Sequence, residues 1–137
     1  RIKKMKIVNE KPPIFDKIIA AGMSPSLDST IFTYGDIIYN PSGQPIPDHL
    51  IAHEATHTKQ QGEFPKTWWG KYLSDEKFRF EQEAEAYANQ YAFICKTVKD
   101  RNIRVKILYE LARILAGPTY GNIITRTKAM ELIKQKL

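Results

Sequence analysis

The order of apolar, capping and stop residues predicts a mostly helical chain. Five segments have the pattern of helices: residues 13–21, 48–61, 75–98, 103–116 and 125–136. Asp48 and Thr125 are suited to cap two of these helices, and Gly62 is suited to end the one that Asp48 opens. Either Ser74 or Asp75 can cap the longest helix.

Two short segments have the composition of strands. Residues 3–9 contain adjacent β-branched side chains and are followed by two prolines. Residues 30–39, TIFTYGDIIY, predict either a strand with a bulge or a tight hairpin around Gly35-Asp36. Trp68 and Trp69 lie in a stretch to which no element is assigned, and we expect them to cover the core rather than form a substrate pocket. The predicted fold is α+β, mostly helical, with a small β element before the helix at 48–61.

Length and composition narrow the class of protein. The 137 residues fit a single domain, and an apolar fraction of 42% with 11% aromatic residues argues against disorder. No apolar run approaches the roughly 18 residues of a membrane-spanning helix. Cys95 is the single cysteine, which excludes an intrachain disulfide framework and a cysteine-rich zinc module.

The positive charge lies at the two ends of the chain. Residues 1–20 carry six basic and two acidic side chains, and residues 99–137 carry nine and three, whereas residues 21–98 carry six and ten. An acidic middle suits a cation better than a phosphate backbone, so nucleic-acid binding is ranked last. The basic start lacks the apolar stretch of a signal peptide, and we expect a cytoplasmic or phage-associated protein without membrane contact. A chain that begins with arginine leaves open the removal of an earlier leader.

The main candidate metal-binding and catalytic residues lie in the sequence HEATH at residues 53–57. His53 and His57 are four residues apart, so both imidazoles lie on one face of the predicted helix and can bind one ion. Glu54 lies about 100° around the helix from His53, where it can act as a general base on metal-activated water. The alternative is an ordinary half-buried histidine pair with Glu54 in solvent.

A zinc ion in such a site needs a third protein ligand. The extended motif with a third histidine fits poorly, because Gln60 and Glu63 occupy the positions of its glycine and histidine. The stretch FEQEAEAYA at 80–88 offers three glutamates on a predicted helix. Glu81 is favoured as the ligand over Glu63, Glu83 and Glu85, and Glu83 is expected to point away. The alternative is an acidic face exposed to solvent.

Two further polar side chains are expected near the metal. Glu85, one turn after Glu81, is expected to accept a hydrogen bond from the outer ring nitrogen of a ligand histidine and so fix its tautomer. His49 precedes His53 by one turn, but with His57 it would span about 12 Å of helix rise. We therefore expect His49 at the rim of the site.

HEATH followed by EQEAEAYA resembles the HExxH…ExxxD pairing of zincin-type metallopeptidases that use a glutamate ligand. Thermolysin-like enzymes and the membrane-integral CAAX prenyl proteases carry this pairing. The chain is also similar to short stand-alone HExxH proteins of bacteria and tailed phages. The resemblance covers residues 48–88 and implies a minimal zincin-like domain.

The resemblance implies that His53, His57 and Glu81 bind zinc and that Glu54 is the general base. The aspartate of the family pattern is replaced by Glu85, which keeps the charge on a longer side chain. The membrane helices of the prenyl proteases are missing from this sequence, so the substrate of that class is not carried over.

In zincins a strand before the histidine helix lines the cleft, and residues 30–39 hold that place in the order. An extended peptide would pair with the edge of this strand. The reaction also needs a donor for the carbonyl oxygen. Tyr120, between glycines in a predicted turn, is the candidate, with Tyr87, Arg79 and His49 as alternatives and a packing role for Tyr120 equally open.

The sequence therefore predicts a zinc-dependent metalloendopeptidase that acts on a peptide or protein substrate. The alternative is a catalytically silent zinc-binding structural or interaction protein, for example one in a phage particle. Its oligomeric state is left open.

Overall fold

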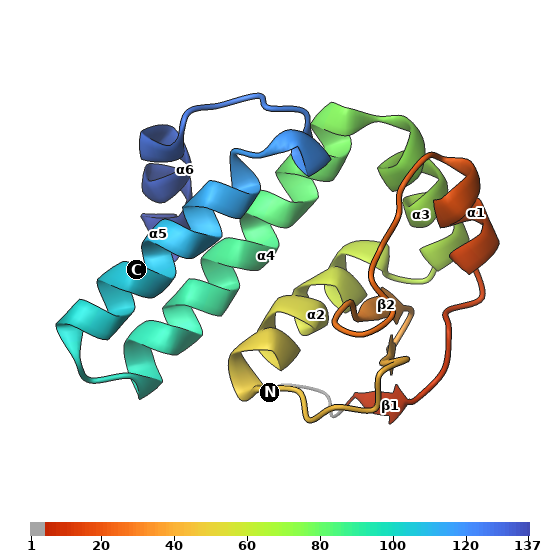
Figure 1. Ribbon diagram of the computed structural model, residues 1–137, viewed down its shortest axis with the longest axis horizontal. Coiled ribbons are helices and arrows are strands. Elements are labelled where there is room, and N and C mark those ends of the chain that lie inside the picture. The colour runs from red at the N-terminus through yellow and green to blue at the C-terminus, as the bar shows by residue number, and fades with distance from the viewer. Residues whose placement is uncertain (1–4) are drawn as a thin grey trace.

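The computed structural model describes residues 5–137 and has one small sheet and six α-helices in that range (Figure 1). The strands are β1 (Lys6–Val8), β2 (Phe32–Tyr34) and β3 (Ile37–Tyr39). The helices are α1 (Phe15–Ala20), α2 (Asp48–Gln61), α3 (Pro65–Ser74), α4 (Glu76–Thr97), α5 (Arg101–Leu115) and α6 (Arg126–Ile133), with short 3-10 helices η1 (Pro118–Tyr120) and η2 (Lys134–Lys136). The predicted class, α+β and mostly helical, is confirmed. Within residues 5–137, no helix is both long enough and apolar enough to cross a membrane.

The three strands form one sheet in the order β1-β3-β2. β2 and β3 are antiparallel with Tyr34 opposite Ile37, so the two residues between them form a tight turn. Gly35 begins that turn at φ 65°, which glycine adopts without a steric penalty. The hairpin alternative for residues 30–39 is therefore confirmed. β1 pairs with β3 in parallel, while residues 3 and 4 of the strand predicted over 3–9 lie outside the described residues.

Most helix boundaries agree with the capping residues of the sequence. The Asp75 side chain accepts a hydrogen bond from the backbone N–H three residues on, at the start of α4. Thr125 caps α6 in the same way. The start of α2 differs from the prediction: Pro47 holds the N-cap position, and Asp48 is the first helical residue. At that position the negative charge of Asp48 interacts favourably with the positive end of the helix dipole.

Helix α3 has no counterpart among the predicted elements. Pro65 opens it at a position where the missing N–H has no helical partner to lose. Trp68, Trp69 and Tyr72 all turn inward and are at least nine-tenths buried. The proline and the short length of this segment hid its helical spacing. Both tryptophans belong to a core cluster, as expected, but they also line a cleft, which was not expected.

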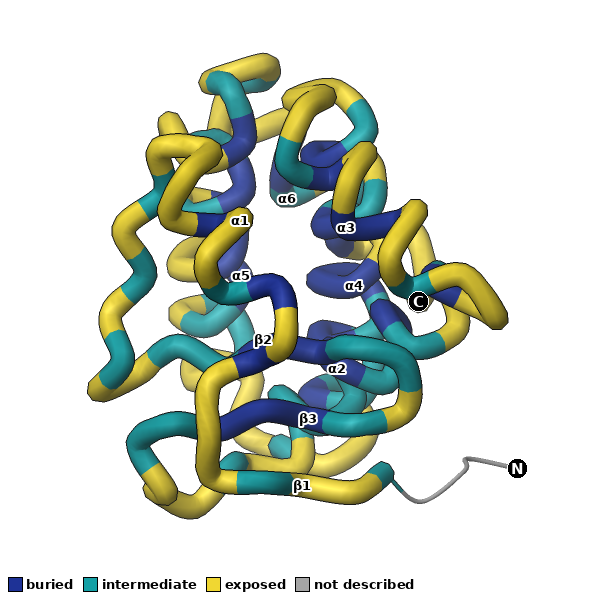
Figure 2. The backbone as a smooth tube through the Cα atoms, turned by 90° about the vertical axis from the view of Figure 1, so that its right-hand side faces the viewer, coloured by how far each residue is buried: buried dark blue, intermediate teal, exposed yellow. Residues whose placement is uncertain are grey.

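The buried apolar residues form two clusters, and helix α2 contributes to neither. One joins α4, α5, α6 and η1, and the other joins α1, the hairpin and α3 (Figure 1). Helix α2 packs most extensively on α4 and also contacts β2. Buried residues of β3, α2 and α4 lie in the interior of the molecule, and exposed residues lie around them (Figure 2). The histidine motif on α2 therefore lies between the two clusters.

Side chains at the end of α2 and on α3 fasten the hairpin to the rest of the protein. Gln61 donates from its Nε2 to the carbonyl of Thr33 at 2.8 Å and accepts from the N–H of Gly35 at 2.7 Å. Thr58 donates its hydroxyl to the carbonyl of Gly35 at 2.8 Å, and the indole N–H of Trp69 donates to the carbonyl of Thr33 at 2.9 Å. These bonds fix the edge strand β2 against the helix that carries the histidines.

Replacing Gln61 by alanine is expected to lower the free energy of unfolding by about 1–3 kcal/mol, because it removes a buried side chain that bonds the partly buried N–H of Gly35 and the carbonyl of Thr33. Urea denaturation of the variant and the wild-type protein measures this. Lys59→Ala removes an exposed side chain from the same helix and is expected to change stability by less than about 0.5 kcal/mol. Equal unfolding midpoints for the Gln61 variant and the wild-type protein would contradict this role.

Candidate metal centre

Helix α2 directs the three candidate site residues of the HEATH motif into the protein. His53, Glu54 and His57 are each 5–6% exposed. The two imidazole rings lie edge to face with centroids 4.9 Å apart, and their Nε2 atoms are 3.2 Å apart. The four-residue spacing thus brings two nitrogens to one point, as expected from the sequence.

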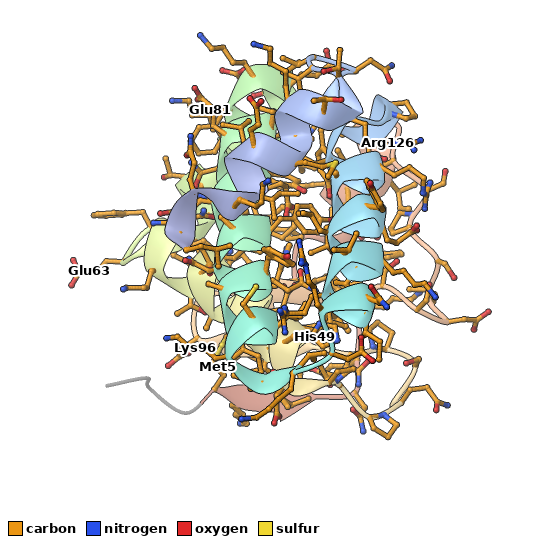
Figure 3. The ribbon with its side chains drawn as sticks, turned by 90° about the vertical axis from the view of Figure 1, so that its left-hand side faces the viewer. Met5, His49, Glu63, Glu81, Lys96 and Arg126 are labelled. Carbon is orange, nitrogen blue, oxygen red and sulfur yellow. The ribbon has the colours of Figure 1, made fainter. Side chains whose placement is uncertain are left out.

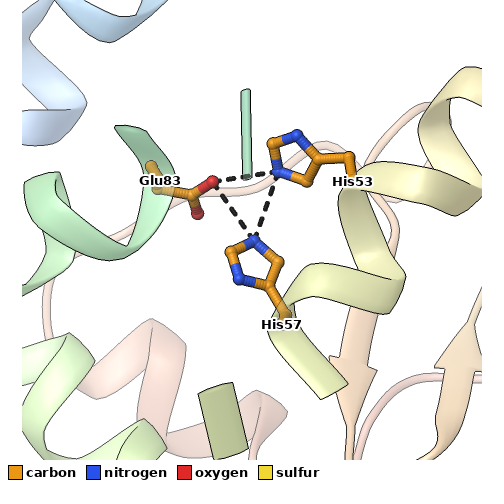
Figure 4. Close-up of side chains that lie close together, drawn as sticks. All are labelled: His53, His57 and Glu83. Carbon is orange, nitrogen blue, oxygen red and sulfur yellow. Dashed lines mark hydrogen bonds and ion pairs between the residues drawn. The ribbon is translucent and has the colours of Figure 1, made fainter. Parts of the chain in front are cut away.

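Glu83 of α4 supplies the third inward-facing atom. Its Oε1 lies 3.0 Å from Nε2 of His53 and 3.2 Å from Nε2 of His57 (Figure 4). All three side chains are buried, and one ligand atom from each lies within 4.8 Å of the others. This group could hold a metal ion.

The structure brings Glu83, not Glu81, to the histidines. Glu81 is exposed to solvent at the surface of α4 (Figure 3). Glu83 lies three residues after Phe80 and four before Tyr87, within the buried apolar face of the helix. The expectation that Glu83 points away is wrong for this reason. A carboxylate in the middle of an apolar stripe is the sequence signal that identifies it.

The ring nitrogen of each histidine that faces away from the centre, Nδ1, is hydrogen-bonded to a glutamine side chain. Nδ1 of His53 is 2.9 Å from Oε1 of Gln90, and Nδ1 of His57 is 2.8 Å from Oε1 of Gln60. An amide oxygen only accepts, so in this arrangement each Nδ1 carries the hydrogen. When the ring is neutral, each Nε2 then presents its lone pair to the centre. This is the tautomer that binds a metal through Nε2.

Glu85 does not contact a ligand histidine. It is exposed, and its Oε1 accepts from Nε2 of Gln60 at 2.9 Å. Gln60 also donates to the backbone carbonyl of Gln82 at 2.9 Å. The side chain of Gln60, three residues after His57 on the same helix, occupies the place expected for Glu85. Gln60 therefore lies between Glu85 and His57, and Glu85 helps to orient the amide of Gln60.

Tyr72 of α3 holds the other oxygen of the carboxylate. Its hydroxyl donates to Oε2 of Glu83 at 2.6 Å, which leaves Oε1 directed at the histidines. Burial, together with the nearby charge of Glu83, raises the pKa of Tyr72 well above its usual value. The phenol therefore remains protonated and continues to donate this bond.

Burial and charge act in opposite directions on the pKa of the inward-facing groups. Burial lowers the pKa of His57, but the charge and hydrogen bond of Glu83 outweigh it and raise the pKa to about 9. Burial raises the pKa of Glu83, but the charge of His57 and hydrogen bonds from both histidines hold it well below its usual value. Glu83 is therefore ionised and supplies the negative charge that a cation needs.

The three atoms at the centre are arranged so that they could hold a cation. Once both Nδ1 atoms donate to amides, the three atoms at the centre are all acceptors. A proton on His57 can bridge two of them, whereas a metal ion satisfies all three. Tetrahedral zinc with bonds of about 2.0–2.1 Å separates its ligand atoms by about 3.3 Å. The 3.0–3.2 Å separations in this centre are close to that value.

Glu54 lies beside the centre without joining it. Its Oε2 is 4.0 Å from Nε2 of His53, and its Oε1 accepts a hydrogen bond from the hydroxyl of Thr33 at 2.7 Å. The alternative of a solvated Glu54 is excluded by its burial. The hairpin thus fixes one carboxylate oxygen and leaves the other next to the histidines.

The centre opens into a cleft of about 1050 Å³. Its walls come from both clusters and include Phe32, Trp69, Leu111 and Tyr120, with Glu54 also at its surface. Tyr120 is 8% exposed and is part of the helical cluster, so it both packs and lines the cleft.

The alternatives to Tyr120 occupy different positions. Tyr87 lines the same cleft, with its ring edge-on to that of Tyr120 at a centroid distance of 6.4 Å. Arg79 donates to the backbone carbonyls of Tyr72, Leu73 and Thr119, so its guanidinium has a structural role. Those bonds leave it poorly placed as a donor to a substrate.

The edge of β2 is only partly open to a peptide. The carbonyl of Thr33 already accepts from Gln61 and Trp69, which fills its two lone pairs. Thr30 and Ile31, just before the strand, also line the cleft. Pairing with an extended substrate is therefore restricted to that part of the edge.

The remaining predicted residues lie outside the centre. Glu63 is exposed at the end of α2 and projects away from the molecule (Figure 3). His49 is half-buried one turn before His53, and its Nδ1 accepts from Nε2 of Gln90 at 2.9 Å. The outer partners Gln60, Gln90 and Tyr72 were missed by sequence reasoning, because they come from three helices and share no motif.

No protein-family model, curated protein or solved structure matches this chain. Its resemblance to zinc peptidases therefore rests on the HEATH motif and on a glutamate from a later helix. Among residues 5–137, the structure assembles a buried His–His–Glu group that could hold a metal ion.

Proposed function

We propose that this protein is a zinc-dependent peptidase, with His53, His57 and Glu83 as the zinc ligands. The observation that carries the proposal is that one acceptor atom from each of three side chains meets at one point. The second polar atom of each side chain makes a hydrogen bond elsewhere. Two imidazoles and one carboxylate are a usual ligand set of catalytic zinc, which keeps one further position open. A buried but unligated glutamate at the same cleft supports catalysis.

When bound there, zinc supplies a Lewis acid that polarises a peptide carbonyl and makes a water molecule more acidic. The protein provides the proton acceptor, because Oε2 of Glu54 faces the centre while Thr33 holds Oε1. Glu54 takes the proton of the attacking water and later transfers it to the leaving amine. Tyr120, in the cleft wall, is our candidate donor to the carbonyl oxygen.

The second candidate function is a zinc-binding structural or interaction protein without catalysis. The bond from Thr33 to Glu54 favours it, because one oxygen of the proposed base is already engaged. Both candidates predict zinc binding, and only the peptidase predicts cleavage that depends on Glu54.

Purified protein is expected to bind about one equivalent of zinc through the three proposed ligands. Glu83→Ala is expected to lose this zinc, because it removes the carboxylate of the buried His–His–Glu group. Glu81→Ala is the matched control, two residues away on the same helix but exposed, and is expected to retain the zinc. Metal analysis after dialysis against trace zinc measures both. Retention by the Glu83 variant, or loss by the Glu81 variant, would contradict the ligand assignment.

Glu54→Gln is expected to keep the zinc and to slow peptide hydrolysis by about 100-fold or more, because the amide cannot accept the proton of water. Cleavage of a mixed peptide library, followed by mass spectrometry, measures the rate for the zinc-loaded wild-type protein and the variant. Glu81→Gln serves as the control with unchanged activity. Full zinc occupancy without cleavage by the wild-type protein would exclude the peptidase and favour the second candidate.

A further inference from the structure

Gln90 connects the metal centre to the third histidine. It lies on α4 seven residues after Glu83, which is about two helical turns along the same face. Its side chain is buried, with 2% of the residue exposed. Oε1 is 2.9 Å from Nδ1 of His53, and Nε2 is 2.9 Å from Nδ1 of His49. One amide thus joins a ligand histidine to a histidine outside the centre.

The two ends of an amide have opposite hydrogen-bonding character, so its orientation determines which tautomer its neighbours adopt. When Nδ1 of His49 accepts, the Gln90 amide directs its NH₂ there and its oxygen at His53. His53 then carries hydrogen on Nδ1 and has a free lone pair on Nε2. The opposite orientation would place the hydrogen on Nε2 of His53 and block metal binding through that atom.

We propose that Gln90 is a positioning residue that fixes His53 in its metal-binding tautomer and that His49 fixes the orientation of Gln90. The inference rests on the zinc centre of the proposed function but not on peptide hydrolysis. It gives His49 a role in metal affinity without contact to the metal.

The second ligand histidine is supported in a different way. The amide of Gln60 donates to the carbonyl of Gln82 and to the carboxylate of Glu85, and both groups can only accept. The orientation of Gln60 is therefore fixed whatever the state of any histidine. The tautomer of His57 is set by these acceptors, whereas that of His53 depends on His49.

The test measures zinc affinity by competition with a chromophoric chelator, with peptide cleavage left aside. Gln90→Met removes the acceptor while keeping the length of the side chain, and is expected to weaken zinc binding by about 10- to 100-fold. Gln90→Glu supplies an oxygen that always accepts from His53, and is expected to bind zinc at least as tightly as the wild-type protein. Circular dichroism and thermal unfolding verify that each variant is folded.

The role of His49 is tested by combining substitutions. His49→Phe is expected to weaken zinc binding in the wild-type background, because the amide of Gln90 is no longer held in one orientation. The same substitution is expected to have no effect in the Gln90→Glu protein, since a carboxylate needs no orienting partner. A structural role of His49 would give equal effects in both backgrounds.

Three results would overturn this inference: wild-type affinity in folded Gln90→Met, affinity of Gln90→Glu as low as that of Gln90→Met, or equal effects of His49→Phe in both backgrounds. A wild-type protein that binds no zinc would overturn it together with the zinc centre. A zinc-binding protein that cleaves no peptide would exclude the peptidase and leave the roles of Gln90 and His49 intact.

Discussion

The meeting of three acceptor atoms, from His53, His57 and Glu83, is the constraint on which the rest of the site depends. Burying an ionised carboxylate costs several kcal/mol unless charge and hydrogen bonds compensate for it. Here α2 and α4 hold the carboxylate against two imidazoles, in a buried group that could hold a metal ion. This geometric argument for a metal ion is separate from the sequence motif.

The fold maintains this arrangement from both sides. On one side, the hairpin is bonded to the end of α2 through Gln61 and to Glu54 through Thr33. On the other side, α4 presents Glu83 and Gln90 on the face that packs against α2. Helix α3 adds the hydroxyl of Tyr72. Tyr72 and Gln90 come from helices whose apolar side chains belong to the two core clusters, so the site gains part of its rigidity from the core.

Local patterns predicted the parts of the protein that depend on local geometry. The hairpin around Gly35 and the caps of two helices follow from turn and capping chemistry, and the convergence of His53 and His57 follows from helix periodicity. The third ligand depends on how α4 rotates against α2, which the glutamate spacing alone did not determine. Counting the apolar face of α4 would have selected Glu83 over Glu81, because the buried positions on either side of it are aromatic.

The chemical character of the outer partners bears on what the centre can do. Both histidines are supported by neutral amides, and Glu83 is the single negative charge among the three proposed ligands. Carboxylates in place of Gln60 and Gln90 would make the imidazoles stronger donors and reduce the electron demand of a bound cation. Amides hold the same tautomers without adding charge. A divalent cation at this centre would therefore keep a net positive charge beside Glu54, which supports the proposed polarisation of a substrate carbonyl.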